Sequence, residues 1–267
     1  MFPDKKATEA IKSQPLLRIS AVICGAIALL WLMSASADVP YRVVRTIPHD
    51  PQAFTQGLAY GDGYLYESTG LYGKSTIRQI DPASGEIVQQ RALPAQLFGE
   101  GITLWQSTLV QLTWRERLGL IWDQASFEPL STFDYRGEGW GITEDGSHWI
   151  VSDGSAHLRW LHPTTHQVIE QRLVTTADSQ PVDQLNELEL IEGEIWANLW
   201  NTDRIARIDP ASGRCIEQLD FSELWPVAER PPGVDVMNGI AYDPQRREIY
   251  LTGKFWPLIY VIKFRDD

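Results

Sequence analysis

The chain has 267 residues, of which 43% are hydrophobic and 22% charged, with a formal net charge of −12 at pH 7. This composition indicates one globular domain large enough to bury a substantial core. The excess of acidic residues argues against nucleic acid and anionic membrane surfaces as partners.

Residues 1–37 differ from the rest of the chain and resemble a secretory leader. They contain the basic residues Lys5, Lys6, Lys12 and Arg18, an apolar run over 19–33, and the small residues Ala35, Ser36 and Ala37. This layout predicts a signal peptide that is cleaved near residue 37. A retained inner-membrane anchor over residues 16–37 is the alternative, because a long polar stretch precedes Arg18. The 15-residue apolar run is shorter than the roughly 20 residues of a spanning helix, although Leu16 and Leu17 could extend it past Arg18. Either interpretation predicts a periplasmic or secreted protein.

The folded domain is predicted to span residues 38–267. Cleavage of the leader would remove four positive and two negative charges and change the formal charge from −12 to −14. The domain then contains a single cysteine, Cys215, so it cannot form an internal disulfide. Cys215 lies in an alternating strand pattern, which predicts a buried structural thiol and not a nucleophile.

The first predicted element of this domain is a strand over residues 41–47. A short motif then recurs five times: a variable head residue, a second residue that is Gly in four copies and Glu in one, and Leu or Ile. The copies begin at Gln56, Glu100, Trp140, Asn186 and Asn238, at spacings of 44, 40, 46 and 52 residues.

Each motif opens a unit of short strands separated by turns. In the first unit, strands are predicted from the motif to residue 60, over 64–68, 75–80 and 86–91, with turns at 61–63 and 81–85. The second turn reads Asp-Pro-Ala-Ser-Gly, is repeated letter for letter at 209–213, and has looser versions at 123–127 and 162–166. Four strands per unit of about 40 to 50 residues predict a β-propeller.

The fold predicted is all-β, a five-bladed propeller. The fifth unit has only three strands and ends with residues 260–264, so the strand over 41–47 is expected to complete the last blade and close the ring. Residues 226–232 are expected to form an extended loop between blades.

The hairpin that opens each blade brings further residues to the head positions. The second strand of a hairpin returns to where the first began, so ten positions should converge at one mouth of the central channel. Beside the five heads, these positions are Gly70, Trp114, Gly154, Trp200 and Lys254. The set combines one carboxylate, one amine, three amides and three indoles, which a purely structural role does not require.

Several sequence runs resemble the plant and bacterial type of glutaminyl cyclase over residues 41–264. The runs are Phe54-Thr55-Gln56-Gly57-Leu58, Phe98-Gly99-Glu100-Gly101-Ile102-Thr103, Leu112-Thr113-Trp114, Leu185-Asn186-Glu187-Leu188-Glu189, Trp196-Ala197-Asn198-Leu199-Trp200 and Thr252-Gly253-Lys254. The resemblance implies a five-bladed propeller with glutaminyl-peptide cyclotransferase activity, in which an N-terminal glutamine becomes pyroglutamate and ammonia leaves. It also implies that Glu100 transfers the protons.

The converging residues suit this chemistry. Glu100 is the only carboxylate in the set and can act as base and then as acid. Gln56, Asn186 and Lys254 can donate hydrogen bonds to an oxyanion, so these four are the predicted catalytic residues. The predicted substrate-binding residues are Trp114, Trp140, Trp200, Phe54, Phe98 and Asn238.

Neither a metal nor another cofactor is predicted, because the five histidines lack zinc-ligand spacing. Two alternatives remain open at this point. Glu100, Asn186 and Asn238 also resemble the oxygen ligands of calcium-dependent propeller lactonases, which chelators would inhibit. A non-catalytic peptide-binding propeller would release no ammonia. Peptides or proteins with N-terminal glutamine are the expected partners, and the protein is expected to be a monomer.

Overall fold

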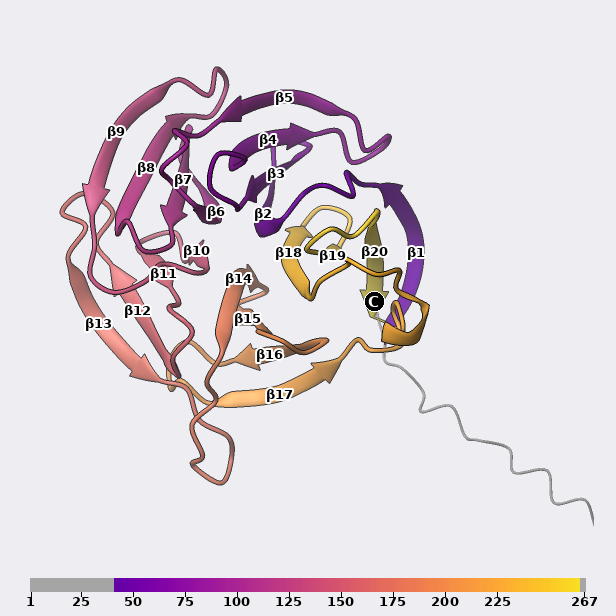
Figure 1. Ribbon diagram of the computed structural model, residues 1–267. Coiled ribbons are helices and arrows are strands. Elements are labelled where there is room, and N and C mark those ends of the chain that lie inside the picture. The colour runs from indigo at the N-terminus through magenta and orange to yellow at the C-terminus, as the bar shows by residue number, and fades with distance from the viewer. Residues whose placement is uncertain (1–40, 265–267) are drawn as a thin grey trace, which may run out of the picture. The chain divides into compact units, whose positions relative to one another are not determined.

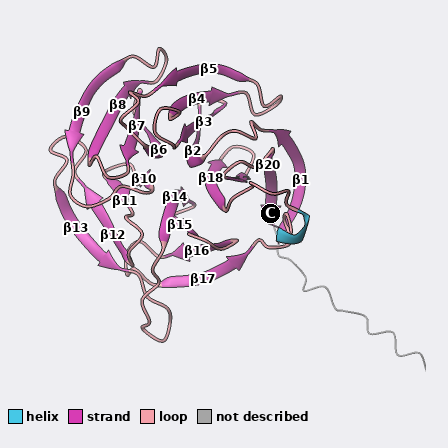
Figure 2. Ribbon diagram, viewed as in Figure 1, coloured by secondary structure: helices cyan, strands magenta, loops and turns pink. Residues whose placement is uncertain are grey.

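The computed structural model describes residues 41–264, which form an all-β propeller of five blades (Figure 1). Twenty strands and one short 3₁₀ helix, η1 (Val227–Glu229), are present in this range (Figure 2). The predicted leader over residues 1–37 lies outside the described residues. Within residues 41–264, no helix has the length and apolar character needed to cross a membrane.

Each blade is a four-stranded antiparallel sheet, and the strand that carries the motif lies innermost in the ring (Figure 1). Blade 1 contains β2 (Thr55–Gly61), β3 (Tyr64–Thr69), β4 (Thr76–Ile80) and β5 (Ile87–Ala92). Blade 2 contains β6 (Gly99–Trp105), β7 (Thr108–Thr113), β8 (Leu118–Asp123) and β9 (Pro129–Asp134). Blade 3 contains β10 (Ile142–Glu144), β11 (Trp149–Val151), β12 (His157–Leu161) and β13 (Val168–Leu173). Blade 4 contains β14 (Leu185–Ile191), β15 (Glu194–Leu199), β16 (Arg204–Ile208) and β17 (Cys215–Asp220).

Blade 5 is closed by the N-terminal strand, as predicted. It contains β18 (Met237–Asp243), β19 (Glu248–Gly253), β20 (Leu258–Phe264) and, on its outer edge, β1 (Tyr41–Pro48). β1 and β20 pair antiparallel from Tyr41 opposite Phe264 to Pro48 opposite Leu258. Ile47 is almost fully buried, so β1 contributes to the core as well as covering an edge.

The turn between the third and fourth strands has the same backbone in all four blades that carry the five-residue sequence pattern. Its fifth residue adopts a positive φ, which is 78° at Gly85, 74° at Gly213, 57° at Phe127 and 58° at His166. In each turn the N–H of this residue donates to the carbonyl of the first turn residue. Glycine adopts this conformation without steric cost, whereas Phe127 is held there by burial and His166 by stacking on aromatic rings of the same region.

The glycine at the second motif position lets neighbouring blades approach closely. A Cβ atom on Gly101 would lie 2.7 Å from the carbonyl oxygen of Trp140, and one on Gly57 would lie 2.5 Å from Ile102 N. Both contacts are with backbone of the next inner strand, so any side chain would push the blades apart. Glu187 replaces this glycine in blade 4.

The carboxylate of Glu187 reaches the inner strands of blades 1 and 5. It accepts hydrogen bonds from Leu58 N at 3.2 Å and from Ile240 N at 2.9 Å. These donors belong to inner strands that have no further strand to pair with, so Glu187 satisfies two otherwise unpaired buried N–H groups.

Large aromatic side chains fill the space between blades. Trp149 is 1% exposed, and Trp122, Trp160 and Trp196 are also buried, as expected for blade-packing residues. Cys215 is a free, buried thiol on β17, and burial raises its pKa.

Candidate active site

A pocket of about 410 Å³ lies at the end of the ring where the first strand of each blade begins and the second ends. All four predicted catalytic residues line it: Gln56, Glu100, Asn186 and Lys254. Five of the predicted binding residues also line it: Phe54, Phe98, Trp114, Trp140 and Trp200. The pocket therefore combines a polar floor with aromatic walls, and its volume is within the range of small-molecule sites.

Hairpin hydrogen bonds bring these residues together. In four blades the N–H at the end of the second strand donates to a carbonyl two residues before the motif head. These bonds are Gly70 N to Phe54 O, Trp114 N to Phe98 O, Trp200 N to Gln184 O and Lys254 N to Val236 O, at 2.8 to 3.0 Å. Blade 3 differs, because Gly154 N donates to Leu185 O of the next blade at 3.1 Å.

The two glycines of the predicted mouth make room for its aromatic rings. A Cβ atom on Gly70 would lie 2.4 Å from the Phe98 ring, and one on Gly154 would lie 2.6 Å from the Trp140 ring. Phe98 packs at 6.0 Å from Phe54, and Trp140 packs edge-on at 5.7 Å from Trp200, measured between ring centroids. The glycines thus allow rings from neighbouring blades to meet at the pocket.

Glu100 is the buried carboxylate of the site. It is 3% exposed, and burial raises the pKa of its carboxyl group well above the usual range. The positive charge of Lys254 and a hydrogen bond from the Gln56 side chain oppose this rise. Glu100 is therefore placed to exchange a proton at a pH far above that of an exposed glutamate.

Lys254 lies in the turn between β19 and β20 and is 5% exposed. Its Nζ atom is 4.7 Å from the centroid of the Phe54 ring, in a cation–π arrangement. Burial lowers the pKa of the Lys254 amine, while the charges of Glu100 and Asp235 oppose that fall. The site thus holds a desolvated cation next to a desolvated carboxyl group.

The two asparagines of the predicted set have different positions. Asn186 lines the pocket, is 3% exposed, and its Oδ1 atom has no hydrogen-bond partner among the described residues. Asn238 is fully buried and does not line the pocket. Its Nδ2 group donates to Thr55 O at 3.1 Å and to Gln56 Oε1 at 3.4 Å, so Asn238 lies behind Gln56 and supports it.

Glu138 is an important pocket residue that the sequence pattern did not identify. Its Oε2 atom accepts hydrogen bonds from Trp114 Nε1 at 2.7 Å and from Trp140 Nε1 at 3.1 Å. Its Oε1 atom accepts one from Arg115 Nε at 3.2 Å, and the Arg115 guanidinium lies 3.8 Å above the Trp114 ring. One carboxylate thus fixes the orientation of two indoles from different blades.

A longer version of the motif identifies most of the missed lining residues. Glu138 and Val236 stand two residues before a motif head, as do Phe54 and Phe98, and Arg115 and Asn201 directly follow mouth residues. Asp235 also lines the pocket. Residues just outside each strand line the pocket together with the first side chain of the strand. The three-residue motif omits these outer positions.

No group of three or more His, Cys, Asp or Glu side chains that could hold a metal ion is found within residues 41–264.

Comparisons with known proteins agree with this geometry. The profile of the family described as glutamine cyclotransferase matches residues 18–264. A glutaminyl-peptide cyclotransferase of Arabidopsis thaliana is 37% identical over 263 residues, which cover 92% of this chain and 82% of the plant protein. The crystal structure of Myxococcus xanthus glutaminyl cyclase is 33% identical, has a TM-score of 0.77, and the match covers 84% of this chain and 95% of that one. The chain therefore belongs to the glutamine cyclotransferase family.

Proposed function

We propose that the pocket binds the N-terminal glutamine of a peptide or protein and converts it to pyroglutamate with release of ammonia. The observation that carries this proposal is the buried Glu100 carboxyl group, whose pKa is raised, facing Lys254 and Gln56 inside an aromatic pocket. Such a group can take up and return a proton at a higher pH than an exposed glutamate does. The family relationship supports peptide and protein substrates.

Glu100 is assigned both proton transfers. The α-amine of the substrate attacks the γ-carboxamide carbon, a new C–N bond forms, and the Glu100 carboxylate takes the proton that the amine loses. The protonated Glu100 then gives this proton to the amide nitrogen as its bond to carbon breaks. Ammonia leaves and the carboxylate is restored. An α-ammonium group has a pKa of about 7.7 to 8.0, so a raised pKa of Glu100 brings donor and acceptor closer in proton affinity.

We assign the stabilisation of the tetrahedral intermediate to Lys254, Gln56 and Asn186. The attacked carbonyl oxygen becomes an oxyanion, and the buried Lys254 ammonium and the amide groups of Gln56 and Asn186 can donate to it. Asn186 has a second use, because its unpaired Oδ1 atom can accept a hydrogen bond from an N–H group of the substrate. Donors fixed in a desolvated site stabilise charge more strongly than donors in water.

We assign the exclusion of water from the pocket to its aromatic walls. Trp114, Trp140 and Trp200 present indole faces, and Glu138 holds two of them in place. These rings can pack against the methylene groups of the glutamine side chain and leave its two reacting ends at the polar floor. From the layout of residues 1–37 we also propose that the protein acts in the periplasm or outside the cell. We propose a monomer because the sequence gives no sign of a large exposed apolar face.

Ammonia release from the dipeptide Gln-Gln tests the proposal directly. We expect the wild type to release ammonia and Glu100→Gln to lose about a hundredfold or more of kcat, since general acid–base catalysis contributes about 10²- to 10⁴-fold. Glu248→Gln is the matched control, because Glu248 is also buried but pairs with Arg45 outside the pocket. Glu100→Gln activity above about a tenth of the wild type would remove Glu100 from this role. A wild type that binds the peptide without releasing ammonia would instead be a peptide-binding propeller.

A further inference from the structure

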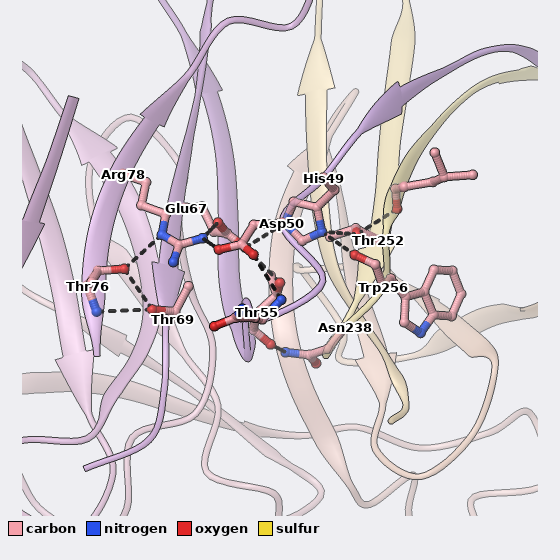
Figure 3. A network of polar contacts seen from close by, with 12 residues as sticks. His49, Asp50, Thr55, Glu67, Thr69, Thr76, Arg78, Asn238, Thr252 and Trp256 are labelled. Carbon is pink, nitrogen blue, oxygen red and sulfur yellow. Dashed lines mark hydrogen bonds and ion pairs between the residues drawn. The ribbon is translucent and has the colours of Figure 1, made fainter. Parts of the chain in front are cut away.

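A buried group of charged and polar side chains lies where blade 5 meets blade 1, outside the pocket lining (Figure 3). We name His49, Glu67 and Thr55 the seam cluster. His49 directly follows β1, Glu67 lies on β3, and Thr55 begins β2. All three side chains are buried, and Glu67 and Thr55 are 0% exposed.

His49 makes hydrogen bonds through both ring nitrogens. Its Nδ1 atom is 2.6 Å from the carbonyl oxygen of Trp256, and its Nε2 atom is 2.9 Å from Glu67 Oε1. A carbonyl oxygen and an ionised carboxylate are acceptors only, so both nitrogens must carry a proton. Either neutral tautomer would turn a lone pair toward one of these oxygens. The geometry therefore fits an imidazolium.

The charges around His49 are balanced. Glu67 also accepts hydrogen bonds from Thr55 Oγ1 at 2.7 Å and from Arg78 Nη1 at 3.4 Å, and Arg78 pairs with Asp50 at 3.0 Å. Two cations thus face two carboxylates, which is the condition under which buried charges are tolerated.

The direction of the pKa of His49 agrees with this charge pattern. Burial lowers this pKa, but Glu67 and the Trp256 carbonyl outweigh burial and Arg78, so that the pKa is raised overall. The pKa of Glu67 is lowered, because His49 and Arg78 outweigh the effect of burial. Two groups of blade 5 also face the ring: the Trp256 carbonyl, in the turn between β19 and β20, and the hydroxyl of Thr252 on β19, which is 3.4 Å from Nδ1.

The seam cluster contacts both segments that carry donors of the proposed reaction. Thr55 directly precedes Gln56, and Trp256 follows Lys254 by two residues in the same turn. Phe255 N, within that turn, donates to Ala53 O at 2.7 Å. His49 is thus bonded on one side to the turn of Lys254 and, through Glu67 and Thr55, on the other side to the strand of Gln56.

We propose that His49, as a buried imidazolium, is a positioning residue that fixes Gln56 of blade 1 and Lys254 of blade 5 relative to each other across the seam. This inference rests on the proposed function, since those two residues are its assigned donors. Small displacements of such groups reduce catalysis strongly even when the fold is kept.

Deprotonation of His49 should therefore loosen the seam as the pH rises through the folded-state pKa of His49. The folded-state pKa is raised above the unfolded value of about 6.5, so the stabilisation is fully present below that pH and is lost as pH rises through the folded-state pKa.

Two measurements test the proposal. The first is ¹⁵N NMR of the imidazole, with the His49 signals assigned by their absence in His49→Gln. We expect both ring nitrogens to be protonated at pH 7. A neutral His49 ring at pH 7 would overturn the imidazolium, whether or not the protein is a cyclase.

The second measurement is steady-state ammonia release from Gln-Gln by folded variants. We expect His49→Gln to lower kcat about tenfold or more, with KM changing less than about threefold, because displaced oxyanion donors affect mainly the transition state. Thr55→Val removes only the hydroxyl that is bonded to Glu67, and it should also lower kcat. This variant replaces His49→Gln in the test if His49→Gln does not fold.

The matched control is Thr143→Val, which removes a buried threonine hydroxyl that accepts from Leu190 N in a different part of the ring. Its kcat should stay within about twofold of the wild type. Equal losses in Thr55→Val and Thr143→Val, or a folded Thr55→Val with wild-type kcat, would show that the seam cluster serves stability only. Absence of ammonia release by the wild type itself would refute the proposed function instead.

Discussion

Replacement of Lys254 by Met separates the two roles that the structure assigns to this residue. The substitution removes the charge but keeps an unbranched apolar chain that can still pack against the Phe54 ring, which lies 4.7 Å from Nζ. Loss of one preorganised donor to an oxyanion costs about 10²- to 10³-fold in kcat, so we expect a loss of that size on the pH plateau.

The second role of Lys254 appears in the pH profile. Its charge opposes the burial that raises the pKa of Glu100. A nearby opposite charge lowers a carboxyl pKa by about 1 to 3 units, so its removal should raise the pKa of Glu100 further. The base form of Glu100 is the active form in the first step, and activity therefore rises as pH increases through that pKa. We call this rising part of the pH–activity profile the acid limb. In Lys254→Met the acid limb should move to higher pH by about one unit or more.

The assay is kcat and kcat/KM for Gln-Gln from pH 5 to 9 in the wild type, Lys254→Met and Lys254→Arg. The substrate amine titrates identically in all three, so differences in the limb belong to the enzyme. Lys254→Arg keeps the charge and should leave the position of the limb unchanged. Because Lys254 is 5% exposed and burial lowers its pKa, we expect Lys254→Met to be at least as thermostable as the wild type. An unmoved acid limb together with a plateau within about threefold of the wild type would refute both roles.

Three further changes test other parts of the structure. Glu138→Gln replaces an acceptor of two indole N–H groups by an amide, so KM for Gln-Gln should rise about tenfold with a smaller change in kcat, and an unchanged KM would contradict the wall assignment. Glu189→Gln should raise the melting temperature at pH 8 but not at pH 4. Burial raises the pKa of this half-buried carboxyl group, so the folded state loses stability as pH rises from the unfolded to the folded pKa of Glu189. Equal shifts of the melting temperature at both pH values would exclude this linkage. Gly101→Ala should lower the free energy of unfolding by about 1 to 3 kcal/mol in urea denaturation, since its Cβ would lie 2.7 Å from Trp140 O, and wild-type stability would show that the blades can separate without cost.

The fold was predictable because its signals are local and repeated. The turn at Asp81–Gly85 and its copy at 209–213 place the third and fourth strands of two blades without knowledge of the rest. The prediction that the N-terminal strand closes blade 5 came from counting strands, and the pairing of β1 with β20 confirms it.

Most of the residues that line the pocket were predictable for the same reason, whereas the depth of each predicted residue was not. Hairpin geometry places Gln56 and Asn238 at equivalent positions, yet Gln56 lines the pocket and Asn238 lies behind it. This difference depends on which neighbouring blade contacts each side chain, and sequence spacing carries no information about that packing.

The seam cluster was not predictable from the sequence at all. Thr55 and Glu67 lie on different strands, His49 follows a third strand, and the three share no repeat position with one another. Only their contacts with Trp256 and Thr252 depend on ring closure, which brings together residues from both ends of the domain. Glu138 was missed for a different reason: it stands just outside a strand, two residues before a motif head, and the three-residue motif does not reach it.

Ring closure by β1 also has a consequence for the order of folding. β1 pairs with β20 across more than 200 residues of intervening sequence, a contact of very long range that carries a large loop-closure entropy and forms slowly. Gln56 lies in blade 1 and Lys254 in blade 5, whereas Glu100 lies in blade 2. A folding intermediate with four complete blades can therefore hold a buried Glu100 and still lack the donor that faces it. Refolding experiments should show β-sheet signal recovering before activity, with the docking of the first strand as the last step.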